Sequence, residues 1–183
     1  MGAPAPSALL AERARGIRLL ACDVDGVLTD GQLQFFALPG GVVEGKSFSV
    51  LDGIGVKVLQ ATGVTVALIT GRQSDIVARR AQEIGVRHVL QGVADKRLAW
   101  EDLLTELGLR PEQSAYIGDD WPDLAVIRAC GLGITVSNAS ELLRRHAHYV
   151  TRAAGGAGAV REACELIMAA QGTLPDGMEA WLQ

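Results

Sequence analysis

The sequence predicts an α/β fold, in which a doubly wound parallel sheet carries helices on both faces. Short apolar runs alternate with helical segments along most of the chain, as in right-handed βαβ units. Aromatic residues make up 4% of the chain and glycines are frequent, which suits parallel strands packed under small helices. With 183 residues, of which 49% are hydrophobic, the chain can build one complete core, so we expect a single domain over 1–183.

The expected elements follow in chain order. A start at 1–7 that is rich in Ala and Pro, and a tail over 173–183, are expected to be mobile. Two short runs flank Pro39-Gly40-Gly41 and predict a β-hairpin insertion over 33–48. Glycines mark several helix ends. The other expected strands are 18–22, 64–69, 86–90, 115–117, 132–136 and 148–151, and the expected helices are 8–15, 52–62, 74–84, 95–107, 121–130, 139–146 and 158–170.

Charge and cysteine usage limit the class of protein. The formal net charge of −4 argues against nucleic acid or an anionic membrane as the main partner. The three cysteines, Cys22, Cys130 and Cys164, are odd in number, far apart and embedded in apolar sequence, so we expect reduced thiols. Neither an apolar run of about 18 residues nor a signal-peptide pattern is present, and we expect a soluble cytoplasmic protein.

Two carboxylates follow the first predicted strand. Asp23 and Asp25 are two residues apart, so a regular strand would place them on the same face. Two like charges at a buried strand end are costly unless a cation or hydrogen bonds compensate for them. Carboxylate and carbonyl oxygens are the ligands of Mg²⁺, and this pair therefore indicates a magnesium site. The alternative is a strand end followed by an ordinary Asp-Gly turn.

Further polar groups are expected at the same edge of the sheet. Thr70-Gly71-Arg72 follows the strand over 64–69, Lys96 opens the helix over 95–107, and Gly118-Asp119-Asp120-Trp-Pro-Asp123 follows the strand over 115–117. Ligands bind beyond the carboxyl ends of parallel strands, where these groups would meet. Each group alone is better explained by a helix cap or a solvated charge. Together with the first motif, they favour a catalytic site.

With these four motifs the chain resembles the haloacid dehalogenase-like phosphohydrolase superfamily over about 18–150. The resemblance implies a phosphatase in which Asp23 is the nucleophile that forms an aspartyl-phosphate and Asp25 is the general acid and base. It implies Mg²⁺ as the cofactor. The residues that the resemblance assigns to the metal are Asp23, Asp25 through its backbone carbonyl, and Asp119, with Asp120 and Asp123 in support, and those that it assigns to the phosphate are Thr70, Gly71 and Lys96.

Only the hairpin over 33–48 could stand for the cap domain that most members carry, so the resemblance is to the capless branch. Matching stretches at 23–31, Lys46-x-Phe48-x-x-x-Asp52-Gly53 and 155–162 extend it over about 17–172. The branch implies a phosphatase of 3-deoxy-D-manno-octulosonate 8-phosphate, a precursor of lipopolysaccharide, and a homotetramer. A nine-carbon, sialic-type sugar acid 9-phosphate is the alternative substrate. Additional cations for an acidic sugar phosphate are Lys46, Arg72 and Arg80.

Other interpretations are weaker but remain open. A phospho-acceptor receiver domain also uses Asp, Thr, Lys and Mg²⁺, but its phosphorylated Asp would close the third strand, and none does so here. An inactive, binding-only relative would lack one of the core residues, and none is missing. The pair Arg79-Arg80 is explained equally well as a solvated helix face. The histidines are expected at the surface or at strand ends, and Trp100 and Trp121 are expected to be packing residues.

Overall fold

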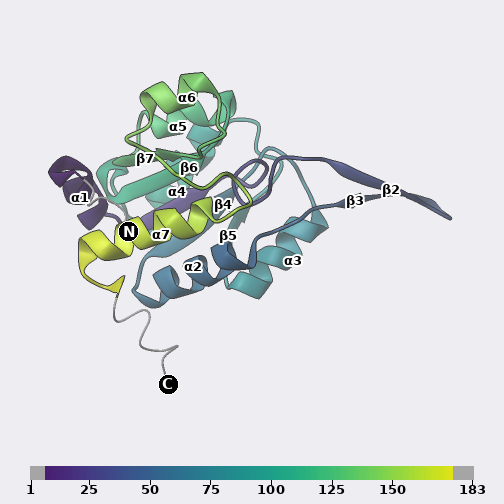
Figure 1. The fold of residues 1–183 in the computed structure, drawn as a ribbon, viewed down its shortest axis with the longest axis horizontal. Coiled ribbons are helices and arrows are strands. Elements are labelled where there is room, and N and C mark those ends of the chain that lie inside the picture. The colour runs from purple at the N-terminus through teal and green to yellow at the C-terminus, as the bar shows by residue number, and fades with distance from the viewer. Residues whose placement is uncertain (1–6, 175–183) are drawn as a thin grey trace.

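The computed structural model describes residues 7–174, and within them a six-stranded sheet forms the centre of the molecule (Figure 1). The strand order is β5-β4-β1-β6-β7-β8, and all neighbouring pairs are parallel. The predicted doubly wound α/β fold is confirmed. The strands are β1 (Leu19–Cys22), β4 (Thr65–Ile69), β5 (His88–Leu90), β6 (Ser114–Gly118), β7 (Leu132–Thr135) and β8 (Tyr149–Val150).

Helices cover both faces of the sheet because successive strand residues point to opposite sides. Leu20 and Cys22 of β1 join the core under one helix layer, whereas Leu19 and Ala21 join the core under the other. The first layer consists of α1 (Ala8–Arg15), α2 (Val50–Ala61), α3 (Asp75–Ile84) and α7 (Ala159–Gln171). The second consists of α4 (Lys96–Leu107), α5 (Leu124–Ile127) and α6 (Glu141–His146).

The register of the central strands determines where the polar motifs meet. Cys22, the last residue of β1, is aligned with Leu68 of β4 and with Ile117 of β6. The residues just beyond these positions are Asp23 in the centre, Thr70 on one side and Asp119 on the other. The three motifs therefore leave the sheet at one edge, as the sequence predicts.

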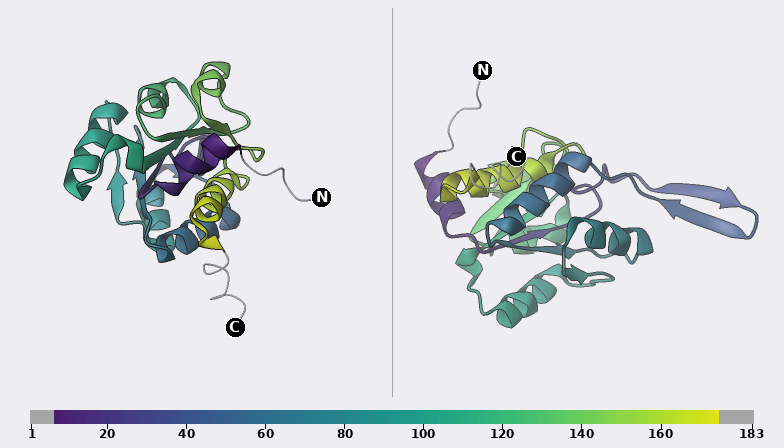
Figure 2. Two further views of the ribbon diagram at one scale, coloured as in Figure 1. Left: turned by 90° about the vertical axis from the view of Figure 1, so that its left-hand side faces the viewer. Right: turned by 90° about the horizontal axis from the view of Figure 1, so that it is seen from below.

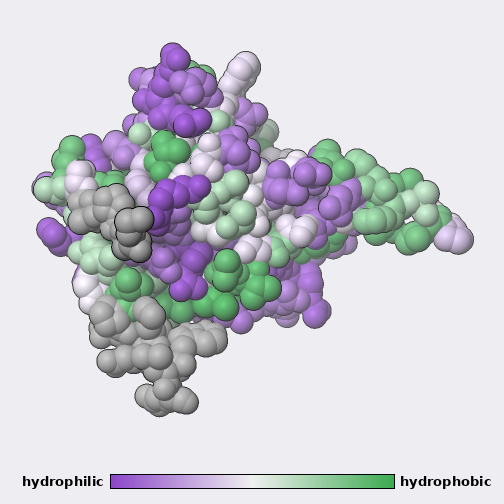
Figure 3. Space-filling model, viewed as in Figure 1, coloured by the Kyte–Doolittle hydropathy of each residue, from purple (hydrophilic) through white to green (hydrophobic). Residues whose placement is uncertain are grey.

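The predicted hairpin is present as β2 (Gln34–Leu38) and β3 (Gly41–Gly45), an antiparallel pair. It extends far from the body of the molecule (Figure 2, right). Its surface is mostly hydrophobic (Figure 3), and its exposed apolar side chains include Phe35, Phe36, Leu38, Val42 and Val43. Between the described strands no further insertion is large enough to form a cap domain.

The expected helix over 121–130 is wrong in part. The structure has a 3₁₀ turn, η2 (Trp121–Asp123), followed by the four-residue α5. Pro122 lacks a backbone N–H, and Asp123 turns its carboxylate back to the start of the turn, so an α-helix begins only after it. Trp100 is buried, as expected of a packing residue, but Trp121 is 70% exposed, so the packing role expected for it is wrong.

The two expected mobile tails lie largely outside the described residues. Ser7 is described and accepts a hydrogen bond from Leu10 N–H at the start of α1. Thr173 donates its N–H to Met168 O after α7. Another short 3₁₀ turn, η1 (Pro111–Gln113), precedes β6. Within residues 7–174, none of the helices combines the length and the apolar character that crossing a bilayer requires.

Candidate active site

A tight turn carries the first motif away from β1. Asp23 N–H still donates to Ile117 O, so the first carboxylate is held by the sheet. Gly26 then takes a φ of +88°, which favours glycine. A side chain is excluded there for a second reason, because a Cβ at Gly26 would lie 2.0 Å from Oδ2 of Asp119. The glycine thus lets the two acidic loops approach each other.

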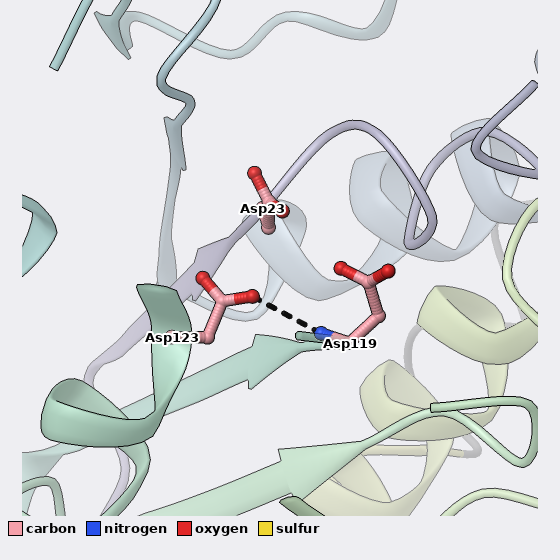
Figure 4. Close-up of side chains that lie close together, drawn as sticks. All are labelled: Asp23, Asp119 and Asp123. Atoms are coloured by element: carbon pink, nitrogen blue, oxygen red, sulfur yellow. Dashed lines mark hydrogen bonds between the residues drawn. The ribbon is translucent and has the colours of Figure 1, made fainter. Parts of the chain in front are cut away.

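Three carboxylates converge at this edge. Asp23, Asp119 and Asp123 offer oxygens within 4.8 Å of one another, and Figure 4 shows Asp23 and Asp119 on neighbouring strand ends with Asp123 beside them. Burial, and secondly the charge of Asp123, raise the pKa of Asp23 to about 7. Burial and Asp123 likewise raise the pKa of Asp119 to about 6. Ionisation of both carboxylates is therefore unfavourable unless a further cation is present.

Lys96 supplies the cation nearest to the cluster. The residue opens α4, whose N-cap Asp95 accepts hydrogen bonds from the N–H groups of Arg97 and Leu98. Lys96 Nζ lies 2.9 Å from Asp23 Oδ1 and 2.7 Å from Asp123 Oδ1. Burial lowers the pKa of Lys96, but the two carboxylates outweigh burial and leave it above its usual value. Lys96 is therefore charged in the folded protein.

Both carboxylate oxygens of Asp123 accept hydrogen bonds from other groups of the protein. Its Oδ1 accepts from Lys96 Nζ and from the hydroxyl of Tyr116, each at 2.7 Å. Its Oδ2 accepts from the backbone N–H groups of Asp119 at 3.1 Å and Asp120 at 3.3 Å, the first of which is drawn in Figure 4. Because both oxygens already have donors, Asp123 fits the predicted supporting role better than that of a metal ligand.

Asp25 lies on the hairpin side of the site, in a chain of alternating charges. Its Oδ1 forms an ion pair with Lys46, whose side chain is buried, and Arg72 Nε lies 3.8 Å from its Oδ2. Glu44 on β3 accepts a hydrogen bond from Arg72 Nη2 at 2.9 Å and lies 3.6 Å from Lys46 Nζ. The hydrogen bond from Arg72 lowers the pKa of Glu44. Two predicted substrate cations thus meet the second carboxylate of the motif.

An open cavity of about 420 Å³ lies in front of these groups. Its lining includes both carboxylates of the first motif, Asp23 and Asp25, and the Thr70-Gly71 pair that follows β4. Thr70 is buried, and its hydroxyl accepts a hydrogen bond from Arg72 N–H at 3.3 Å. The cavity is lined by Asp23, Asp25, Thr70, Gly71, Arg72, Val93, Ala94, Asp95, Lys96 and Pro122.

The donor set fits a hard divalent cation. Asp23 and Asp119 have side-chain oxygens in the cluster, and burial with like charge makes their ionised forms unfavourable without a counter-ion. Carboxylate oxygens are the ligands that Mg²⁺ takes in proteins, in small numbers beside water and substrate phosphate. The arrangement can therefore hold a magnesium ion next to a nucleophilic carboxylate.

Comparisons with known proteins agree with this geometry. A family model described as haloacid dehalogenase-like hydrolase matches residues 87–162. A curated 3-deoxy-D-manno-octulosonate 8-phosphate phosphatase, KdsC of Yersinia pestis, is 48% identical over 89% of this chain and 86% of its own length. The KdsC protein of Escherichia coli K12 is 44% identical over 93% of this chain and 89% of its own length. The chain belongs to the 3-deoxy-D-manno-octulosonate 8-phosphate phosphatase family of haloacid dehalogenase-like hydrolases.

Solved structures place the fold in the same family. A 3-deoxy-D-manno-octulosonate 8-phosphate phosphatase from Moraxella catarrhalis, solved with magnesium, phosphate and KDO, superposes with a TM-score of 0.92. It is 44% identical, and the match covers 97% of this chain and all of the other. A probable phosphatase from Pseudomonas syringae pv. phaseolica also has a TM-score of 0.92, at 51% identity over 97% of this chain and 99% of the other. The resemblance found in the sequence motifs is confirmed.

Not every residue that the sequence motifs single out lies at the cavity of this phosphatase-family site. Asp120 is exposed and contributes its backbone N–H to Asp123. Arg80 lies outside the cavity, between α2 and α3, where it donates to Ser49 O at 2.9 Å and stacks over Phe48 with 5.7 Å to the ring centre. His148 accepts from Gly133 N–H at 2.9 Å, as expected of a residue at a strand end.

Sequence reasoning missed two residues of the site. The strand pattern gives Tyr116 no role beyond the strand, although a buried tyrosine hydroxyl requires a polar partner, and that partner is Asp123. The hairpin pattern gives Glu44 no role either, although it is the only acidic residue over 33–48. In both cases the signal is a single polar group within an apolar segment.

Proposed function

We propose that this protein is a Mg²⁺-dependent phosphatase that hydrolyses 3-deoxy-D-manno-octulosonate 8-phosphate to the free sugar acid and phosphate. The observation that carries the proposal is one open cavity where Asp23, Asp25, Thr70 and Lys96 meet. Membership of the family supports the substrate, as does the relative from Moraxella catarrhalis that was solved with magnesium, phosphate and KDO. The nine-carbon sugar acid is not favoured, because the two curated relatives and the Moraxella catarrhalis structure are named as phosphatases of the eight-carbon one.

Two carboxylates of the first motif divide the chemistry between them. An oxygen of Asp23 attacks phosphorus, the bond from phosphorus to the sugar oxygen breaks, and Asp25 gives its proton to the leaving oxygen. Asp25 then takes a proton from the attacking water, whose oxygen bonds to phosphorus while the bond to Asp23 breaks. Free phosphate leaves, and both side chains return to their starting state.

The remaining groups neutralise the phosphoryl oxygens. Lys96 Nζ lies 2.9 Å from Asp23 Oδ1, so its ammonium group can stabilise the negative charge on the phosphoryl oxygens when Asp23 attacks. Thr70 and Gly71 line the same cavity and can donate to the same oxygens. Asp123 keeps Lys96 charged and in place, and Asp120 helps to fix the acidic loop through its backbone N–H.

A magnesium ion would be held by the carboxylates of Asp23 and Asp119 and by the backbone carbonyl of Asp25. Bound there, it supplies positive charge that reduces the repulsion between Asp23 and the phosphate dianion. Without the ion, the raised pKa of Asp23 disfavours its ionised, nucleophilic form, and the raised pKa of Asp119 disfavours an ionised metal ligand beside it, so a strict metal requirement is expected.

The proposal extends to assembly and location. Packing of hairpins from several copies into a homotetramer would bury the apolar β2–β3 surface, which a monomer leaves open. Arg72 lines the cavity and would meet the acidic sugar. Lys46 is buried against Asp25 and would act on the substrate through that carboxylate, whereas Arg80 lies outside the cavity and donates to Ser49 O. The three described cysteines are buried and free, which suits the reducing cytoplasm.

A phosphate-release screen over sugar phosphates tests the function. The eight-carbon sugar acid 8-phosphate should give the highest kcat/KM, nine-carbon and neutral sugar phosphates lower values, and EDTA should abolish all release. If p-nitrophenyl phosphate or a nucleotide had the highest kcat/KM, the substrate assignment would be wrong. Activity that survives in Asp23→Asn with Mg²⁺ present would refute the mechanism.

A further inference from the structure

Two sequence stretches of this chain have no role in the chemistry described above: Asp52-Gly53 on α2 and the glycine-rich segment that leads into α7. In the structure they are the two ends of one contact. Asp52 is buried, and its Oδ1 accepts a hydrogen bond from Arg161 N–H in the first turn of α7 at 2.8 Å. The two residues are 109 positions apart in the chain.

Asp52 does for α7 what an N-cap side chain does within a helix. The N-cap position of α7 is Gly158, which has φ +106° and no side chain, so the first N–H groups of the helix need an acceptor from elsewhere. The helices approach closely enough for this because residue 55 is glycine, where a Cβ would lie 2.9 Å from Cα of Arg161. A buried carboxylate at a helix N-terminus also interacts favourably with the helix dipole.

The segment before α7 is held at several further points. Glu162 accepts from the backbone N–H groups of Arg152 and Ala153, each at 3.1 Å, and from the Tyr149 hydroxyl at 2.6 Å. Gly155 N–H donates to Oδ1 of Asn138 at 3.0 Å. The loop over 151–158 is therefore fixed from the α7 side and from the α6 side at once.

This fixed loop packs directly on the backbone that follows the Asp23-x-Asp25 motif. Gly156 N–H donates to Val27 O at 2.9 Å. A Cβ at Gly155 would lie 1.8 Å from the carbonyl oxygen of Gly26, and one at Gly156 would lie 2.6 Å from Asp30 N. Gly26 also lies so close to the acidic loop that a Cβ there would be 2.0 Å from Oδ2 of Asp119. The turn over 24–30 is thus enclosed between the 151–158 loop and the acidic loop.

We infer that Asp52 is a positioning residue, which acts through the start of α7 and the 151–158 loop to set the turn that carries Asp25. The inference rests on the proposed phosphatase function. Asp52 touches none of the reacting groups described above, and its effect on the chemistry would be indirect. The phosphate-binding groups Thr70 and Lys96 come from other elements, so the effect should fall on proton transfer by Asp25 and not on substrate binding.

The kinetic test compares Asp52→Ala with Asp52→Asn, which keeps an acceptor oxygen for Arg161 N–H. In Asp52→Ala, kcat should fall about 10–100-fold while KM changes by less than about threefold, since small misplacements of catalytic groups act on kcat. Asp52→Asn should recover most of kcat. Glu162→Gln, which weakens the second anchor, should lower kcat in the same sense without changing KM.

A matched control separates positioning from loss of stability. Val64→Ala removes a buried side chain at the opposite edge of the sheet, just before β4, so it should lower the melting temperature and leave kcat unchanged below the transition. Equal losses of kcat in Val64→Ala and Asp52→Ala at matched stability would overturn the inference. Wild-type kcat in Asp52→Ala would overturn it as well.

Hydrogen exchange tests the same contact without any turnover. The N–H groups of Leu28 and Thr29 donate to Val24 O, and Gly156 N–H donates to Val27 O. In Asp52→Ala these amides should exchange at least about tenfold faster, with no change in Val64→Ala. Unchanged exchange over 24–31 would refute the inference. A wild-type protein that releases no phosphate from any sugar phosphate would instead refute the proposed function.

Discussion

Asp23→Asn should stabilise the metal-free protein while it abolishes activity. Asp23 is buried beside Asp123, and burial raises its pKa from 3.8 to about 7. An acid whose pKa is raised on folding contributes its full stability below its unfolded pKa and loses that stability as the pH rises through the folded value. The loss of folding free energy caused by the ionisation of Asp23 in wild type therefore grows between about pH 4 and pH 7. Asparagine keeps the shape of the side chain and has no such cost.

The magnitude follows from the pKa difference of about three units. At about 1.4 kcal/mol per unit, Asp23→Asn should raise the free energy of unfolding by about 4 kcal/mol at pH 8 and by about 2 kcal/mol at pH 5. In a protein of this size, about 4 kcal/mol corresponds to roughly 8–16 °C in melting temperature. Saturating Mg²⁺ should stabilise wild type and have little effect on the variant, because the variant lacks a metal-binding carboxylate.

Urea unfolding in EDTA at pH 5 and pH 8 measures this difference. Asp102→Asn, at an exposed acid on α4, is the matched control and should change the free energy of unfolding by less than about 0.5 kcal/mol at both pH values. Lower stability of Asp23→Asn than of wild type at pH 8 would refute the prediction, and so would a stability advantage that does not grow between pH 5 and pH 8. Either result would mean that Lys96 compensates fully for the buried charge.

Three further perturbations test the site and the assembly. Asp25→Asn should lower turnover roughly 10²–10⁴-fold and accumulate a phospho-enzyme in rapid-quench experiments, whereas none should form in Asp23→Asn. Lys96→Met removes a cation from two buried carboxylates, so stability should fall by roughly 3–5 kcal/mol at pH 8 in urea unfolding, and less at pH 5, where Asp23 is protonated. Charged substitutions at Phe36 and Val43 should split the assembly in light scattering and reduce activity together. Absence of a phospho-enzyme in Asp25→Asn would contradict the first prediction, and a loss of stability in Lys96→Met that does not depend on pH would contradict the second. A fully active monomer would contradict the third.

The fold was predictable because βαβ patterning is a local signal. The strand over 64–69 and the helix over 95–107 have apolar runs, caps and a terminal glycine within one short window, and the structure places β4 and α4 within a residue or two of those bounds. The prediction of one helix over 121–130 was wrong because Pro122 and the capping carboxylate of Asp123 stabilise a 3₁₀ turn at its start. The prediction for Trp121 was wrong because the exposure of a side chain depends on its neighbours in space, which a single sequence does not show.

The part of the candidate site that lies at the ends of parallel strands could be predicted from the sequence. The ends of β1, β4 and β6 meet whatever the loops do, so Asp23, Thr70 and Asp119 follow from the pattern. The partners of Asp123 and of Asp25 did not follow. The hydroxyl of Tyr116 contacts Asp123 across a turn, and Lys46 contacts Asp25 from the base of the hairpin. Neither pair of residues has a spacing along the chain that marks it as a contact.

The base of the hairpin contacts the proposed active site, so the proposed assembly and the proposed chemistry would be linked. Lys46 follows β3, its side chain is buried against Asp25, and Glu44 on the same strand is paired with Arg72 after β4. Any movement of the hairpin base would therefore change the charges around the proposed general acid and base. Because α2 starts four residues after Lys46 and carries Asp52, the same movement would also reach the start of α7. Packing of hairpins between copies would hold this base still, which gives a physical reason why activity should depend on assembly even for residues that lie within one chain.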